Sequence, residues 1–219
     1  MKTVLITGGA TGLGKELAKL YAQNDYQVIL VGRNLDSLKQ TKEELGAKIV
    51  HAVSIDIQNY EEVTKKMQEL LTVYSVDILI NNAGVGHFGP LSDYSKKMID
   101  DVIDTNVKGT IYMTQACISH LQTRPQGKII NIISTAGLRG KKNESIYVAS
   151  KFAMRGFTES LKVEYQETNL SIIAAYMGGM DTPFWSQNNH IKDKSRLTPP
   201  LHIAQVIYDK QNEKEDIIL

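Results

Sequence analysis

A tyrosine and a lysine stand four residues apart in the stretch YVASK, at Tyr147 and Lys151. On a helix, residues four apart lie on one face about a turn apart, so the phenol and the ammonium group are expected to project to the same side. A free phenol has a pKa of about 10, and a nearby cation lowers that pKa by favouring the phenolate. The pair therefore has the chemistry of an acid and base acting on a proton bound to oxygen. The alternative is an amphipathic pair on a surface helix, and spacing alone does not decide between the two.

A glycine-rich turn follows the first apolar run, where TGGATGLG at 7 to 14 places Gly8, Gly12 and Gly14. Glycine lets a backbone turn tightly and approach a ligand without a Cβ, and the free amides at a helix start favour a pyrophosphate. The position directly after the first strand favours dinucleotide binding over a plain strand-to-helix turn.

The second apolar run ends in VGRN, where an NAD enzyme usually presents an acid to the ribose hydroxyls. Gly32 offers no carboxylate, whereas the planar fork of Arg33 suits a 2′-phosphate. We therefore predict NADP as the cofactor, with NAD as the alternative. Two other readings stay open: a solvent-facing Arg33, and a ribose contact from Asp36.

Short apolar runs alternate with helical patterns along the chain. The expected strands are 3–7, 27–31, 48–53, 77–80, 128–133 and 170–176, with a last one at 216–219, and the expected helices are 12–23, 35–45, 60–74, 95–121 (two in succession), 147–168 and 201–211. Runs such as VLIT and VILV are apolar throughout, as in strands covered on both faces. The pattern predicts one α/β domain over residues 1–219, a Rossmann-type doubly wound parallel sheet with helices on both faces.

The balanced charge favours a protein that acts on small molecules. A cytoplasmic location is also expected. Lys plus Arg number 25 against 24 Asp plus Glu, without a block of like charge, so we expect no nucleic-acid partner. We expect no membrane partner either, because no run approaches the ~18 apolar residues of a membrane span. Cys117 stands alone in a helical apolar pattern, which predicts a buried small hydrophobe. The histidines and this cysteine lack zinc-type spacing, so no metal is expected.

Over nearly its whole length the sequence resembles the short-chain dehydrogenase/reductase family. The matching stretches are TGGATGLG, DI at 56 and 57, NNAG at 81 to 84, TNVKG at 105 to 109, the serine at 134, YVASK, and GGMDT at 178 to 182. One departure is Met177, which stands where the family commonly has proline. A softer closure over the nicotinamide is expected there, because proline would fix φ.

The resemblance implies an NAD(P)-dependent oxidoreductase that interconverts a ketone or aldehyde and its alcohol. It implies a catalytic group of Asn106, Ser134, Tyr147 and Lys151. It also implies a cofactor site made by Gly8, Ala10, Thr11, Gly12, Leu13, Gly14, Arg33, Asp56, Ile57, Asn82, Ala83, Gly84, Tyr147, Lys151 and Thr182. A non-catalytic NADP-sensing regulatory protein on the same fold is the alternative function.

Hydride transfer to a carbonyl carbon leaves charge on the oxygen, which must be protonated as it forms. Tyr147 is the expected acid, and Ser134 is expected to donate a hydrogen bond to the substrate oxygen. The resemblance adds that Lys151 grips the nicotinamide ribose and that Asn106 binds a water leading to solvent.

Residues 181–200 are expected to form a substrate lid, in which Phe184 and Trp185 line an apolar pocket or anchor the lid. GHFGP at 86 to 90 is expected in the pocket wall, with His87 against the substrate or simply exposed. The helical stretches at 106–121 and 147–168 pair between subunits in relatives, so a homodimer is expected, with a tetramer as the alternative.

Overall fold

Seven parallel strands form one sheet in the order β3-β2-β1-β4-β5-β6-β7. The computed structural model describes residues 1–46, 48–185, 190, 193–213 and 215–219. The strands are β1 (Thr3–Thr7), β2 (Gln27–Gly32), β3 (Ile49–Ser54), β4 (Ile78–Asn81), β5 (Lys128–Ile132), β6 (Ser171–Tyr176) and β7 (Ile217–Ile218). The predicted doubly wound parallel sheet is confirmed, and the expected strands differ from these only at their ends.

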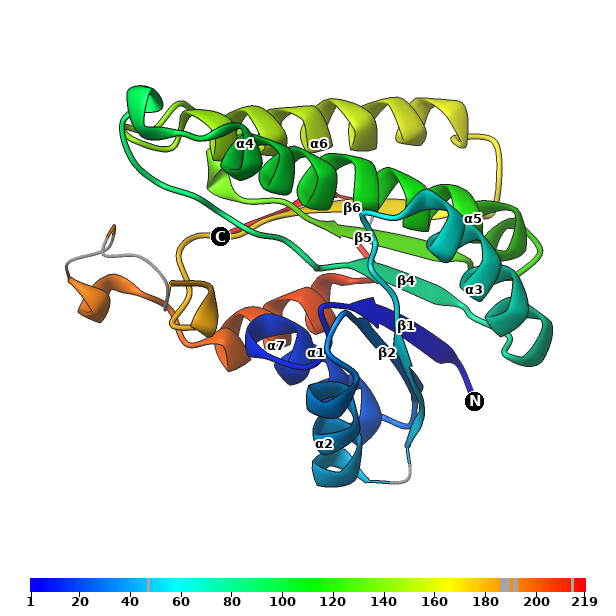
Figure 1. Ribbon diagram of the computed structural model, residues 1–219. Helices are drawn as coiled ribbons and strands as arrows, with labels where there is room; N and C mark the ends of the chain where they lie inside the picture. Colours follow the sequence, from blue (N-terminus) through cyan, green and yellow to red (C-terminus); the bar gives the residue numbers. More distant parts are fainter. Residues whose placement is uncertain (47, 186–189, 191–192, 214) are drawn as a thin grey trace.

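Helices cover both faces of the sheet (Figure 1). One face carries α1 (Gly12–Gln23), α2 (Leu35–Leu45) and α7 (Pro200–Lys210), and the other carries α3 (Tyr60–Val73), α4 (Lys96–Ile103), α5 (Thr110–Gln122) and α6 (Ser145–Glu164). Successive side chains of a strand point to opposite faces, so β1 feeds two cores. Val4 and Ile6 pack in the core of α1 and α7, while Leu5 packs in the core of α3 and α5.

Asparagine and serine side chains fix where three helices begin. The side chains of Asn34, Asn59 and Ser95 accept hydrogen bonds from backbone N–H groups in the first turns of α2, α3 and α4, at 3.0, 3.0 and 3.2 Å. Each bond satisfies a backbone donor that has no partner within its helix.

The helical stretch expected at 95–121 consists of α4 and α5 joined by a π-helical turn, Asp104–Gly109. The turn contains Asn106, and the Thr110 hydroxyl donates to the Asn106 carbonyl at 3.0 Å. A π-turn inserts extra backbone into a helix and often marks a functional site. The next helix, α6, runs from Ser145 to Glu164 instead of over 147–168.

The chain reverses its direction across the sheet between β3 and β4, so that β1 and β4 lie side by side at the switch point. In open α/β sheets, ligands bind beyond the carboxyl ends of the strands at such a point. Among the described residues, no helix is both long enough and apolar enough to cross a bilayer.

Candidate active site

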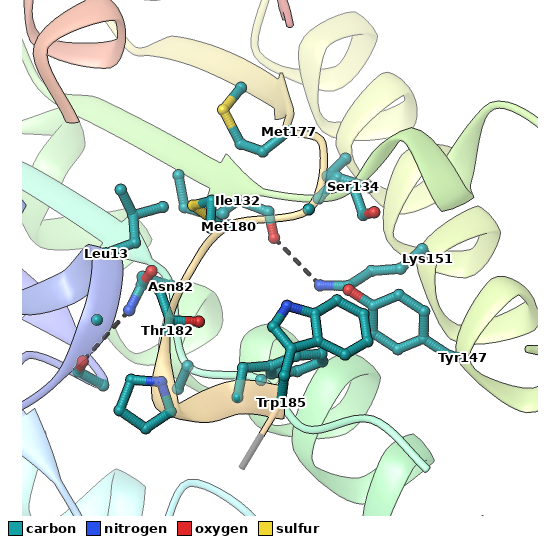
Figure 2. A pocket seen from close by; sticks show the side chains of 18 of the residues that line it. Leu13, Asn82, Ile132, Ser134, Tyr147, Lys151, Met177, Met180, Thr182 and Trp185 are labelled. Carbon is teal, nitrogen blue, oxygen red and sulfur yellow. Dashed lines mark hydrogen bonds between the residues drawn. The ribbon is translucent and has the colours of Figure 1, made fainter. Parts of the chain in front are cut away.

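A cavity of about 500 Å³ opens at the carboxyl ends of the central strands. Figure 2 shows the side chains around it, which come from the glycine turn, the ends of β4 and β5, α6 and the segment after β6. It brings together twelve of the predicted site residues: Gly8, Thr11, Gly12, Leu13, Arg33, Asn82, Ala83, Gly84, Ser134, Tyr147, Lys151 and Thr182. The other five lie outside its lining: Ala10, Gly14, Asp56, Ile57 and Asn106.

The glycine turn has a backbone that other residues adopt poorly. Gly8 and Gly12 have φ angles of 66° and 51°, in the left-handed region that glycine enters freely. A Cβ on Gly14 would lie 2.1 Å from the carbonyl oxygen of Gly8, so only glycine fits there. Because the turn opens α1 at the cavity, its backbone amides fit a pyrophosphate group.

Asn82 and Thr7 join the glycine turn to the loop after β4. The Asn82 side chain donates to the carbonyls of Thr7 and Gly8 at 2.9 and 3.3 Å. In return, the Thr7 hydroxyl accepts the backbone N–H groups of Asn82 and Ala83, both at 3.0 Å. Asn82 therefore supports the turn, a role that a ribose contact alone does not predict.

Tyr147 and Lys151 lie one turn apart on α6, with Ser134 just beyond the end of β5 (Figure 2). The Lys151 amine lies 5.6 Å from the centre of the Tyr147 ring and donates to the Ile132 carbonyl at 3.3 Å. All three side chains are buried. The predicted grouping of phenol, ammonium and hydroxyl at one end of the cavity is therefore present.

The expected downward shift of the Tyr147 pKa is not found. Burial raises the pKa of this phenol strongly, hydrogen bonding with Ser134 acts in the opposite direction, and the Glu144 carboxylate raises the pKa further. Burial also lowers the pKa of Lys151 to about 8. Desolvation disfavours the charged form of both groups, so it outweighs the attraction between ammonium and phenolate.

The Asn106 side chain hydrogen-bonds to protein groups on two segments. Its side chain accepts the Val85 N–H at 2.8 Å and donates to the Val85 carbonyl at 2.9 Å. It also donates to the Ser150 hydroxyl at 3.0 Å. Asn106 therefore ties the loop after β4 to α6 at Ser150, one residue before Lys151.

Two of the residues outside the cavity lining have local structural roles. The Asp56 carboxylate accepts the backbone N–H of Gln58 at 3.1 Å, which is a turn interaction. Ile57 is buried, and a Cβ on Gly109 would approach its side chain to 2.7 Å. The buried Cys117 behaves as predicted, and burial raises the pKa of its thiol to about 12.

Aromatic side chains from separate segments pack beside Tyr147. Phe88 lies 5.4 Å from Tyr147, 5.0 Å from Trp185 and 4.8 Å from His190 between ring centres. Phe184 and Trp185 both line the cavity and contact Phe88. Gly86 makes room, because a Cβ there would lie 2.6 Å from the Phe88 ring.

Sequence reasoning placed Phe88 in the pocket wall and His190 in the lid segment without giving either a role, and it missed Glu144. The position of Glu144, three residues before Tyr147, was the available signal, because residues three apart share a helix face. His87 was expected against substrate or exposed, but its ring pairs with Asp101 at 2.8 Å. No cluster of three His, Cys, Asp or Glu side chains arranged for a metal occurs in the part of the chain that the structure describes.

A glycine turn at the switch point of a parallel sheet, with a buried Ser, Tyr and Lys at the other end of one cavity, defines a dehydrogenase-type nucleotide-binding protein. Residues 2–193 match the profile of the short chain dehydrogenases, and the chain belongs to this family of oxidoreductases. An uncharacterized oxidoreductase of Staphylococcus aureus is 32% identical over 208 residues, which cover 94% of this chain and 90% of the relative.

Solved structures agree with this assignment. A 3-ketoacyl-(acyl-carrier-protein) reductase from Brucella melitensis, complexed with NADH, is 25% identical and superposes with a TM-score of 0.90 over 100% of this chain and 96% of the other. The closed form of a serine dehydrogenase, complexed with NADP⁺, is 26% identical with a TM-score of 0.90 over 99% and 94% of the two chains.

Proposed function

We propose that this protein is a cytoplasmic, NADP-preferring oxidoreductase that interconverts a ketone or aldehyde and its alcohol. The observation that carries the proposal is the placement of Ser134, Tyr147 and Lys151 in the same cavity as the glycine turn. Hydride exchange between a bound nicotinamide and a carbonyl carbon needs a proton-transfer group, whereas a protein that only senses the nucleotide does not.

In the reduction direction the phenol of Tyr147 gives its proton to the substrate oxygen. The raised pKa of Tyr147 keeps the phenol protonated at neutral pH, which suits an acid. The Ser134 hydroxyl donates a hydrogen bond to the same oxygen and stabilises the charge that develops there. Lys151, when protonated, opposes the negative charge left on Tyr147. The nicotinamide cofactor supplies or accepts the hydride when bound.

Arg33 supports the preference for NADP. Its side chain is exposed and lines the cavity, where a guanidinium suits a phosphate. Asp36, the competing ribose ligand, is outside the cavity lining and lies in the first turn of α2, where a carboxylate favours the helix dipole. Known structures of relatives contain NADH or NADP.

The remaining assignments follow the family pattern. Asp56 and Ile57 would flank the adenine, Asn82 to Gly84 the ribose, and Thr182 the nicotinamide carboxamide. A Cβ on Gly12 would lie 3.1 Å from the Thr182 side chain, which supports a site closed between the glycine turn and this threonine. Asn106 would bind the water that links Lys151 to solvent.

We also propose that residues 1–219 form one domain and that the protein is a homodimer. Phe152 and Val163, on α6, have 41% and 68% of their surfaces exposed, and pairing of this helix with a second copy would cover them. Size-exclusion chromatography with light scattering tests the assembly; a monomer at micromolar concentration would contradict it.

A panel of ketones and aldehydes, followed by NADPH absorbance, tests the enzymatic function. The wild type is expected to oxidise NADPH with at least one carbonyl, and Tyr147→Phe is expected to bind NADPH but lose turnover. A wild type that binds NADPH tightly and is inert to every carbonyl would favour the NADP-sensing alternative.

Titration with NADPH and NADH tests the cofactor preference. Arg33→Ala is expected to weaken NADPH binding roughly tenfold, the size of one lost charge-assisted hydrogen bond, and to leave NADH binding unchanged. An unchanged ratio of the two affinities would refute the phosphate role of Arg33.

A further inference from the structure

Glu144 occupies the N-cap position of α6, but its carboxylate does not cap the helix. At this position Ser, Thr, Asp and Asn side chains commonly accept a backbone N–H of the first turn. The Glu144 side chain instead lines the cavity beside Tyr147, and the residue is only 8% exposed. A carboxylate with so little contact with water needs a hydrogen-bonding partner.

The partner is His190, which lies 46 residues further along the chain. Its Nε2 lies 3.0 Å from Oε1 of Glu144. The His190 ring also stacks on Phe88 at an interplanar angle of 15° and lies near-parallel to Trp185 at 16°. His190 thus combines a polar contact to Glu144 with ring contacts to Phe88 and Trp185.

The surface that receives His190 is fixed by backbone contacts of its own. The N–H of Gly89 donates to the carbonyl of Asn143 at 2.8 Å, which joins the loop carrying Phe88 to the residue before Glu144. Phe88 and Glu144 are therefore held together independently of His190. The turn that carries Trp185 is fixed too, since the N–H of Trp185 donates to the Thr182 carbonyl at 3.2 Å.

We propose that Glu144 is a positioning residue, which holds His190 so that the stack of Phe88, Trp185 and His190 closes the substrate end of the cavity over Tyr147. This inference rests on the proposed carbonyl–alcohol activity. It adds that a carboxylate three residues before the acid holds the ring of His190 in this stack. The bond is charge-assisted, and such bonds are stronger than neutral ones.

The Glu144 carboxylate also affects the protonation of Tyr147. Glu144 raises the pKa of Tyr147, so it favours the protonated phenol that reduction requires. Lys141 lines the same cavity and carries the opposite charge, but its amine donates to the Thr135 hydroxyl at 3.3 Å. Burial and the Glu144 carboxylate also raise the pKa of Tyr94, whose phenol donates to the His87 carbonyl.

Trp185 is the only tryptophan of the chain, so its fluorescence reports directly on the stack. Glu144→Ala is expected to shift the Trp185 emission to the red and to increase its quenching by acrylamide. Glu144→Gln keeps an acceptor oxygen and is expected to stay close to wild type. Glu159→Ala is the matched control, because Glu159 lies on the same helix in an exposed pair with Arg155.

Kinetics supply the second readout. With a carbonyl substrate found in the panel, Glu144→Ala is expected to raise KM roughly tenfold, as for one lost hydrogen bond to a charged group, with a smaller change in kcat. NADPH affinity is expected to stay unchanged, because Arg33 and the glycine turn are untouched.

His190→Phe keeps a ring for stacking but removes the donor, and serves if Glu144→Ala does not fold. It is expected to increase acrylamide quenching of Trp185 in the same way. Wild-type emission and quenching in both variants would overturn the positioning role. If no carbonyl is turned over, the proposed activity fails, while the fluorescence still decides whether Glu144 holds the stack.

Discussion

Replacing Gly14 by alanine tests whether the glycine turn is fixed by backbone contact. The new Cβ would lie 2.1 Å from the Gly8 carbonyl oxygen and 2.7 Å from the Asn82 amide nitrogen. The first distance is about 0.9 Å short of the 3.0 Å that real Cβ contacts keep. A carbonyl of the main chain cannot rotate away like a flexible side chain, so α1 must move from the turn.

Overpacking of this kind costs about 1–3 kcal/mol of the free energy of unfolding. For a chain of this size, 1 kcal/mol lowers Tm by about 2–4 °C, so a fall of about 2–12 °C is expected. We also expect NADPH binding to be lost, because the amides of the turn and of α1 are displaced from each other.

Thermal unfolding by circular dichroism and NADPH titration measure the two effects at equal protein concentration. Gly140→Ala is the control, since its φ is not positive and, in the part of the chain that the structure describes, nothing beyond its chain neighbours lies within 4 Å of its Cβ position. It is expected to be neutral or stabilising by up to about 1 kcal/mol. If Gly14→Ala unfolds at the wild-type Tm and binds NADPH normally, the steric argument is wrong.

Three further outcomes are expected. Carbonyl reduction should fall as pH rises through about 8, because Lys151, with its lowered pKa, is charged below that value and neutral above it; a flat pH–rate profile to pH 10 would contradict this. Cys117 should react with a thiol reagent only in denaturant, because it is fully buried; rapid labelling of the folded protein would contradict its burial. Asn106→Ala should lower the free energy of unfolding in urea by about 1–3 kcal/mol, because polar groups of Val85 lose their partners; an unchanged urea midpoint would show that Asn106 does not hold this loop.

Local pattern predicted most of the fold. The helices α1 and α2 have the bounds that apolar periodicity indicates, because each buries one stripe against the sheet. The π-turn around Asn106 was missed as such, since an extra residue in a helix leaves only a weak break in periodicity. The start of α6 at Ser145 shows the usual uncertainty at helix ends.

For the site, the sequence by itself determined which groups share a helix face and which turn needs glycine. Tyr147 and Lys151 follow from the period of a helix, and Gly14 follows from the motif. Only the tertiary structure decided how deeply these groups are buried, and with that the upward direction of the Tyr147 pKa. Desolvation depends on what covers a group, and here the rings of Phe88 and Phe184 that cover Tyr147 come from segments far apart in the chain. No local pattern records such contacts, because they exist only once the strands have brought those loops to one edge of the sheet.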